Sequence, residues 1–336
     1  MNGSADDSGA TMQPTASGND QGWKARVLFY LVAGIPVAML AAAPRVWLDL
    51  PQRVALVCHP TIADGGAFAT GSPLLEPVPA PVLKANTAEE LVDLLKAYDL
   101  WEVLEQERDP LQVLFAAYPP NLASLEDGRI RKRVFFHTLL PAALATLDEV
   151  AGERQVLRGI LERLGSPPPE TVRFGEQAPW RERLRPWETA FLAELVAKYN
   201  TDQAAELLLR VDVVPPSLIL GQGALESDWG RSKLALSHHN PFGMMVGSRA
   251  ASFGSIPEAV SEFVHLLNSH PAYRRFRQIR AKSRDPLVLA TGLAGYSQRG
   301  AEYVQDVRRL IAGNRLQAYD RFTPRGQASL PDERAT

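Results

Sequence analysis

The stretch that decides the fold runs from 215 to 230 and reads PPSLILGQGALESDWG. Pro215 and Pro216 predict the start of a helix, because a proline in the first turn loses no hydrogen bond. Little polar surface is left on the residues that follow, so we expect this helix to be buried; its apolar residues are Leu218, Ile219, Leu220 and Leu225. Gly221 and Gly223 would weaken an exposed helix, so we expect another backbone to pack closely against them.

Glu226 stands at the end of this apolar run, with Trp229 and Gly230 following. A carboxyl group held against leucine and tryptophan side chains loses hydration, which disfavours its charged form and raises its pKa. A glycosidase needs such a neutral carboxylic acid to protonate the oxygen of the bond that breaks. From these residues alone, two interpretations stay open: a catalytic acid, or a helix-end glutamate that caps the helix or pairs with a cation.

Helical patterns dominate outward from this stretch, and strand-like alternation is scarce, so the sequence predicts a mainly α protein. A capping box formed by Thr87 and Glu90 begins a small helical module. Two further helical patterns follow in it, through Val134–Leu144 and Glu153–Leu164. The expected order from there is a helical module at 87–165, a Pro- and Gly-rich linker at 166–186, a catalytic domain at 187–320, and a disordered tail at 321–336.

A candidate membrane anchor lies near the start of the chain, at 23–48. It contains the uncharged run Val27–Ala43, whose 17 residues are near the lower limit for crossing a bilayer. Trp23 and Trp47 bracket this run, as interfacial aromatic residues often do, and two basic residues precede it. The alternative is a cleaved signal peptide, which would export the chain equally well. We therefore expect the protein at the inner membrane, with its catalytic domain facing the periplasm.

The segments on either side of the anchor have compositions of their own. Residues 1–22 are polar and expected to be disordered, because they have too little apolar surface to offset chain entropy. Residues 49–86 are rich in proline and glycine and predict a linker.

Composition and charge narrow the class of protein. Of the 336 residues, 46% are hydrophobic, which is enough for a sizeable core, and the net charge of −2 carries no footprint of a nucleic-acid partner. Cys58 is the only cysteine and cannot form an internal disulfide. The adjacent His238 and His239 would face different sides of a helix, so no metal site or other cofactor is expected.

Several separated motifs resemble one family. The pieces are RKRVFFHTLLP at 131–141, ALESDWGRS at 224–232, NPFG at 240–243, LNSHPAY at 267–273 and LAGYSQRGAEYV at 293–304. In this order they resemble bacterial N-acetylglucosaminidases of glycoside hydrolase family seventy-three, in its Bax-like branch. These enzymes have a mannosyl-glycoprotein endo-beta-N-acetylglucosaminidase-like domain. The resemblance covers roughly 110–320 and implies a lysozyme-like catalytic domain.

The resemblance implies roles for particular residues. It makes Glu226 the general acid and places the catalytic Tyr296 close to that acid and the sugar. Residues expected to bind substrate are Trp229, Asn240, Phe242 and Tyr303. For Asn240 and Phe242 the alternative is a structural turn, and for Tyr296 a core tyrosine with a bonded hydroxyl.

One departure from the family concerns the second carboxylate. Many relatives have a β-lobe after the FG turn that supplies it, whereas the segment 244–255 is short here and contains no Asp or Glu. The remaining candidates are Asp228, Glu258 and Glu262. Alternatively, the substrate's own N-acetyl group assists the reaction.

The expected activity is hydrolysis of peptidoglycan glycan strands after N-acetylglucosamine. One alternative is a lytic transglycosylase that uses Glu226 to cut after N-acetylmuramic acid. The other is a catalytically inactive glycan-binding protein at the inner membrane.

Overall fold

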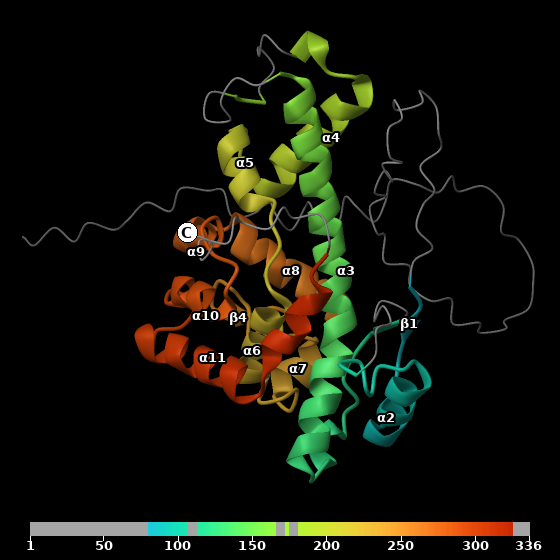
Figure 1. Ribbon diagram of the computed structural model, residues 1–336. Coiled ribbons are helices and arrows are strands. Elements are labelled where there is room, and N and C mark those ends of the chain that lie inside the picture. Colours follow the sequence, from blue (N-terminus) through green and yellow to red (C-terminus); the bar gives the residue numbers. More distant parts are fainter. Residues whose placement is uncertain (1–79, 106–112, 166–171, 175–180, 325–336) are drawn as a thin grey trace, which may run out of the picture. The chain divides into compact units, whose positions relative to one another are not determined.

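The longest described helix is α3 (Gly128–Arg163), which has 36 residues, and the other helices lie along it (Figure 1). The computed structural model describes residues 80–105, 113–165, 172–174 and 181–324. These residues are mainly helical, as predicted. The predicted N-terminal segments 1–22 and 23–48 lie outside the described residues, and so do residues 325–336 of the predicted tail. The start of that tail, predicted from 321, is wrong, because the helix η6 (Leu316–Phe322) includes its first two residues.

Helix α3 differs from the sequence pattern, in which the helical signals at 134–144 and 153–164 are separate. Both belong to this one helix, which begins at the N-cap Asp127 and continues through Pro141. A proline inside a helix removes one backbone hydrogen bond. Side chains on both sides of it are fully buried, among them Leu139, Leu140 and Leu147. Because tertiary packing supplies most helical stability in proteins, this burial outweighs the lost bond.

The N-terminal part of the described chain packs beside α3. Helix α2 (Ala88–Ala97) begins at Thr87, whose side chain accepts a hydrogen bond from the Glu90 amide, so the N-cap half of the predicted capping box is confirmed. The Glu90 carboxylate accepts from the Asn86 amide, not from that of Thr87. Strand β1 (Val82–Leu83) pairs in parallel with β2 (Leu114–Phe115). Since β1 lies inside the predicted linker 49–86, the end of that segment has regular structure.

Helix α6 (Pro216–Ser227) starts at its N-cap Pro215 and is buried along most of its length, as predicted. It packs against α3, α11 (Ala301–Gly313) and η6 (Leu316–Phe322). The expectation of a close backbone at its glycines is wrong. A Cβ at Gly221 would lie 2.8 Å from the Ile311 side chain, and one at Gly223 would lie 3.0 Å from that of Leu139.

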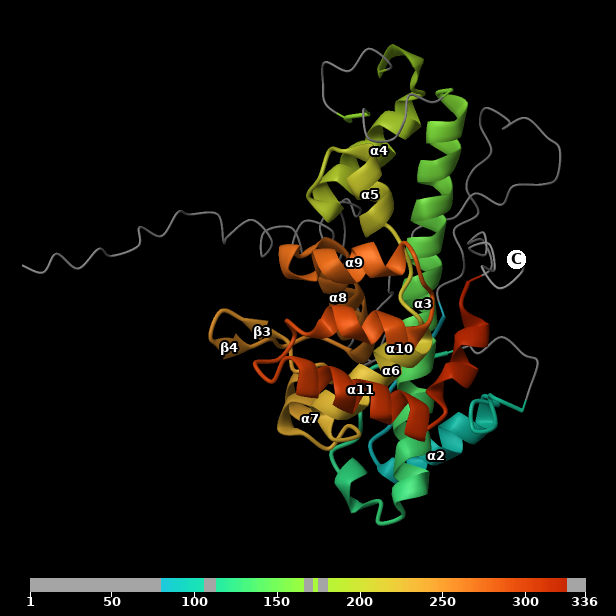
Figure 2. The same ribbon diagram turned by 60° about the vertical axis from the view of Figure 1, so that its left-hand side comes forward.

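The remaining elements complete the helical array. Helix α4 lies with α5 beside one end of α3, and the β3–β4 hairpin projects from the helices on one side (Figure 2). Their bounds are η1 (Leu122–Ser124), η3 (Arg181–Arg183), α4 (Pro186–Tyr199), α5 (Ala204–Arg210), α7 (Lys233–His238), β3 (Met245–Val246), β4 (Arg249–Ala250), α8 (Ile256–Ser269), η4 (Pro271–Tyr273), α9 (Arg274–Arg280), α10 (Pro286–Leu289) and η5 (Ala290–Leu293).

One hydrophobic core joins the regions that the sequence divides into a module and a domain. Helix α3 packs against both α6 and α8, and buried residues from 85 to 319 form a single cluster. The predicted division into a module and a domain at 166–186 therefore rests on composition alone, because residues on both sides of it share one core. Within that segment, Arg173 forms a β-bridge with Gln203, and α4 begins at Pro186.

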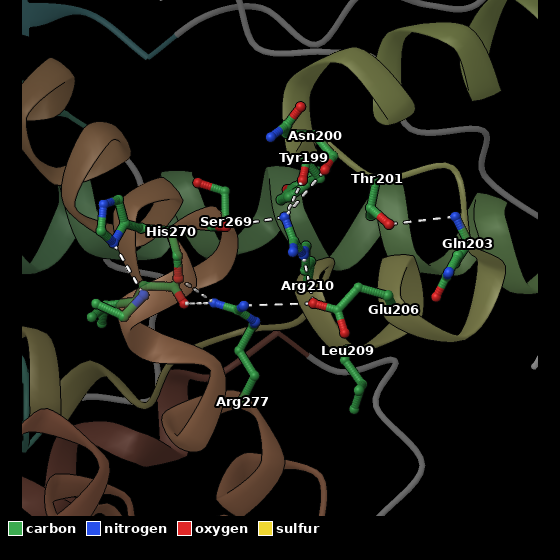
Figure 3. A network of polar contacts seen from close by, with 12 residues as sticks. Tyr199, Asn200, Thr201, Gln203, Glu206, Leu209, Arg210, Ser269, His270 and Arg277 are labelled. Atoms are coloured by element: carbon green, nitrogen blue, oxygen red, sulfur yellow. Dashed lines mark hydrogen bonds and ion pairs between the residues drawn. The ribbon is translucent and has the colours of Figure 1, made fainter. Parts of the chain in front are cut away.

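A charged network fixes α5 to the helices that follow α6 (Figure 3). The Glu206 carboxylate accepts from Arg210 at 2.7 Å and pairs with Arg277 at 3.5 Å. Arg210 also donates to the carbonyl oxygens of Tyr199 and Ser269, and Arg277 to that of His270. Two arginines on different helices thus share one carboxylate. Both also donate hydrogen bonds to carbonyl oxygens at the ends of helices.

Among the described helices, α3 is long and apolar enough to cross a membrane by length and composition. Its apolar window is mostly buried inside the protein, as in many core helices. Length and composition are therefore weak grounds for a membrane span at α3.

Candidate active site

Glu226 lies in the last turn of α6 and is half-buried. Burial raises the pKa of its carboxyl above the ordinary value, and the nearby Tyr303 hydroxyl and Arg299 partly offset that rise. Directly after it, Asp228 and Trp229 both adopt positive φ angles, of 50° and 59°. The backbone therefore turns sharply out of the helix and leaves Glu226 at the helix exit.

The turn at 240–243 covers the Glu226 carboxyl. Gly243 has a φ of +63°, and a Cβ built there would lie 3.1 Å from Glu226 Oε2. Both the backbone conformation and the space thus favour glycine. The NPFG motif brings bare backbone against the candidate acid, and a side chain at this position would displace the carboxyl.

Asn240 holds the base of the β3–β4 hairpin. Its Nδ2 donates to the carbonyl oxygens of Met244 and Ala251, and its Oδ1 accepts from the Met244 amide. The side chain is fully buried, and all of these bonds stay within the protein. Asn240 therefore shapes the loop beside Glu226, which corresponds to the structural alternative predicted for it.

Phe242 and Tyr296 attach the turn at 240–243 to the core. The Phe242 ring is fully buried and stacks on Phe263 with centroids 4.1 Å apart. The hydroxyl of Tyr296 donates to the Phe242 carbonyl oxygen at 2.6 Å. Tyr296 is half-buried, so part of this residue remains exposed while its hydroxyl anchors the turn.

The charge of Glu226 affects the pKa values of three tyrosines. The ring of Tyr296 lies 6.2 Å from that of Tyr273 and stacks on that of Tyr303 at 5.7 Å. Burial, and then the Glu226 charge, raise the pKa of all three hydroxyls, that of Tyr273 to about 12. Tyr303, predicted to bind substrate, is almost fully buried beside Glu226. In this structure it faces the acid from inside the protein.

Trp229 points to α3. Its ring makes edge contacts with Phe135 and Phe136, and the Lys132 ammonium lies 4.5 Å from its centroid. The positive φ angles after α6 carry the ring toward these partners. Trp229 is thus packed against α3 next to the exit of α6, and its predicted contact with substrate stays a prediction.

The three candidates for a second carboxylate have partners of their own. Asp228 is exposed and pairs with Arg231. Glu258 accepts from the Gly254 amide at the start of α8. Burial and the neighbouring Glu258 raise the pKa of Glu262, and Lys198 lowers it. None of these carboxylates is among the groups that act on Glu226.

Sequence reasoning missed four residues around Glu226. Gln222 stands one helical turn before it, so the helical period could have revealed it. Gly243, Tyr273 and Arg299 stand in three of the motifs that carry the family resemblance, which is the signal that could have found them. Their contact with Glu226 depends on the packing of α6 against the C-terminal helices. Among the described residues, no cluster of three or more His, Cys, Asp or Glu side chains is arranged to hold a metal ion.

Comparisons with known proteins agree with this arrangement. The family described as mannosyl-glycoprotein endo-beta-N-acetylglucosaminidase matches residues 201–316, which include α6, the 240–243 turn and the tyrosine cluster. Protein bax of Escherichia coli (strain K12) is 33% identical over 227 residues, which cover 76% of that protein and 58% of this chain. No solved structure matches the chain.

Proposed function

This chain belongs to the Bax-like family of endo-beta-N-acetylglucosaminidases, and we propose that it hydrolyses peptidoglycan after N-acetylglucosamine with Glu226 as general acid. The family makes it a glycan hydrolase, that is, a glycoside hydrolase-type enzyme. The bond that is cut and the residue that donates the proton form the proposal.

The single observation that carries the proposal is the environment of Glu226. Its carboxyl is half-buried at the exit of a buried helix, and burial raises its pKa. Bare backbone at Gly243 lies against one side of it. A carboxylic acid that keeps its proton near neutral pH is what the departing sugar oxygen requires.

The second chemical group is proposed to come from the substrate. The segment 244–255, which supplies the second carboxylate in many relatives, contains no Asp or Glu here. The remaining candidates are engaged elsewhere: Asp228 pairs with Arg231, Glu258 accepts from the Gly254 amide, and Glu262 interacts with Lys198. We therefore propose that the substrate's N-acetyl group attacks the sugar carbon while Glu226 protonates the leaving oxygen.

Purified sacculi provide the test. The full-length protein is incubated with sacculi, and the released fragments are identified by mass spectrometry. We expect fragments with reducing N-acetylglucosamine ends, and we expect Glu226→Gln to lower their release by at least about 100-fold. Glu162→Gln, at an exposed position on α3, is the matched control and should leave the release unchanged.

Other outcomes separate the alternatives. Anhydro-muramic ends would identify a lytic transglycosylase. Binding to sacculi without cleavage would identify a glycan-binding protein. Cleavage that persists unchanged in Glu226→Gln would remove the assignment of the acid.

The proposed location is the inner membrane, with the catalytic region in the periplasm. It rests on the uncharged run Val27–Ala43 and its flanking tryptophans. Membrane fractionation followed by protease treatment of intact spheroplasts tests it. A protein recovered only in the cytosol would contradict this location.

A further inference from the structure

Two buried polar side chains next to Glu226 have unsatisfied hydrogen-bonding groups. Gln222 on α6 is fully buried, and Tyr303 on α11 nearly so. Neither amide atom of Gln222 nor the Tyr303 hydroxyl has a hydrogen bond of standard geometry within the described part of the chain. Because buried polar groups in proteins are normally hydrogen-bonded, two adjacent side chains without a bond of standard geometry at a candidate active site call for a functional reason.

The fold places both side chains on one side of the candidate acid. Gln222 precedes Glu226 by four residues, so the two side chains lie on the same face of α6. Helix α11 packs against α6, and the Tyr303 hydroxyl interacts with both Gln222 and Glu226. The Tyr303 ring stacks on Tyr296, whose own hydroxyl is fixed by Phe242. The Tyr303 hydroxyl thus lies close to both the Gln222 amide and the Glu226 carboxyl.

We propose that Tyr303 and Gln222 are positioning residues that hold Glu226 through a hydrogen-bond chain whose direction reverses when the acid loses its proton. This inference rests on the proposed role of Glu226 as the general acid. While Glu226 is protonated, its hydroxyl donates to Tyr303, and Tyr303 donates to Gln222 Oε1. Once Glu226 is charged, Tyr303 donates to its carboxylate, and Gln222 Nε2 donates to Tyr303.

The chemistry of the three groups suits this reversal. A tyrosine hydroxyl donates and accepts, and a glutamine amide offers a donor at one atom and an acceptor at the other. Only hydroxyl hydrogens and the amide need to turn. Because a donor to a carboxylate forms a stronger bond than a neutral pair does, the chain favours the charged state. The remaining groups that interact with Glu226 are Arg299, Tyr273 and Tyr296.

The test is a direct titration of Glu226 in the full chain. Glutamate carboxyl carbons are labelled with ¹³C, and the Glu226 signal is assigned by its loss in Glu226→Gln. We expect Tyr303→Phe to raise the pKa of Glu226 by about one unit, because the charged form loses its donor. Gln222→Met, which keeps the shape of the side chain, should give a smaller rise. That rise should vanish in the Tyr303→Phe background, since Gln222 acts only through the hydroxyl.

Tyr319→Phe is the matched control, because it removes the hydroxyl of another buried tyrosine that interacts with His137 instead. It should leave the pKa of Glu226 unchanged. An unchanged pKa in Tyr303→Phe would overturn the inference. So would a Gln222→Met effect that is absent, or that is equal with and without the Tyr303 hydroxyl.

Activity provides a second readout. The alkaline limb of the kcat/KM profile should move to higher pH in Tyr303→Phe, with a fall in kcat and little change in KM. The titration needs no substrate, so the two proposals can fail separately. Wild-type protein that leaves sacculi intact but shows the expected pKa shifts would reject the proposed function alone. Active protein without those shifts would reject the positioning pair alone.

Discussion

Gly243 and Gly247 both have positive φ angles but differ in what surrounds them. Their φ angles are +63° and +60°. A Cβ at Gly243 would press on Glu226 Oε2, whereas one at Gly247 would meet nothing within 4 Å. This pair therefore separates backbone strain from displacement of the acid.

We expect Gly243→Ala and Gly247→Ala to lower the free energy of unfolding by similar amounts, each about 1 kcal/mol. Only Gly243→Ala should also lower kcat, by about 10-fold, because the new Cβ pushes the Glu226 carboxyl by a fraction of an ångström from its working position. Chemical denaturation and kinetics on sacculi measure the two effects. Equal activity in the two variants would show that Gly243 does not position Glu226.

Single substitutions also test whether a second carboxylate takes part in the reaction. If the substrate's N-acetyl group assists, Asp228→Asn, Glu258→Gln and Glu262→Gln should each retain most of the wild-type rate. The product should also keep the β configuration at the new reducing end, as a double displacement requires. NMR of freshly released fragments reports that configuration. A loss of about 100-fold in one variant would instead identify the missing carboxylate.

Helix α6, the element that carries the acid, has an unusual start. Pro215 and Pro216 provide no side chain that can cap it. Asp320, on η6, supplies the cap by accepting from the Ser217 amide and hydroxyl, both at 2.8 Å. Burial raises the pKa of Asp320 to about 6, against the bonds from Ser217 that lower it. The contribution of this cap to stability therefore depends on pH.

The direction in which stability changes with pH follows from the raised pKa of Asp320. The folded state binds this proton more tightly than the unfolded state, so stability falls as pH rises from about 4 to about 6. Asp320→Asn keeps the cap and has no charge. Its stability relative to wild type should therefore improve by an amount of order 2 kcal/mol across this pH range. Asp320→Ala should lose about 1 kcal/mol through loss of the cap. Urea unfolding at pH 4 and pH 7 measures these differences, and a parallel pH response of wild type and Asp320→Asn would contradict them.

The bounds of α6 and the burial of α6 follow from the sequence, because prolines and an apolar run act within one element. The cap from Asp320 does not, since it comes from a distant segment. For the same reason Glu226 could be singled out, whereas the motifs that contain Tyr273 and Arg299 gave no sign that these side chains lie beside it. The roles expected of Asn240 and Trp229 depended on where their side chains point. The hairpin base and the turn after α6 decide this, and neither has a periodic signal.

At the scale of the whole molecule, α3 packs against both α6 and α8, and charged groups join other helices of the same core to one another. Helix α5 is attached to α8 and α9 through Glu206, Arg210 and Arg277 (Figure 3). Arg277 is almost fully buried, and Arg210 is mostly so. A carboxylate that neutralises two shielded arginines contributes more than one in water, because desolvated cations need a partner.

Glu206→Gln tests this junction. The substitution keeps the size of the side chain but leaves Arg210 and Arg277 without their shared anion, so the free energy of unfolding should fall by about 2 kcal/mol. Asp306→Asn is the matched control, because Asp306 also joins two arginines, Arg299 and Arg309, which are 53% and 74% exposed. Water and salt screen that surface group, so its loss should cost less than about 1 kcal/mol. Guanidinium would mask ion pairs, so urea unfolding at low salt is the measurement. Equal losses in the two variants would mean that burial adds nothing at the α5 junction, and that apolar packing alone holds α5 in place.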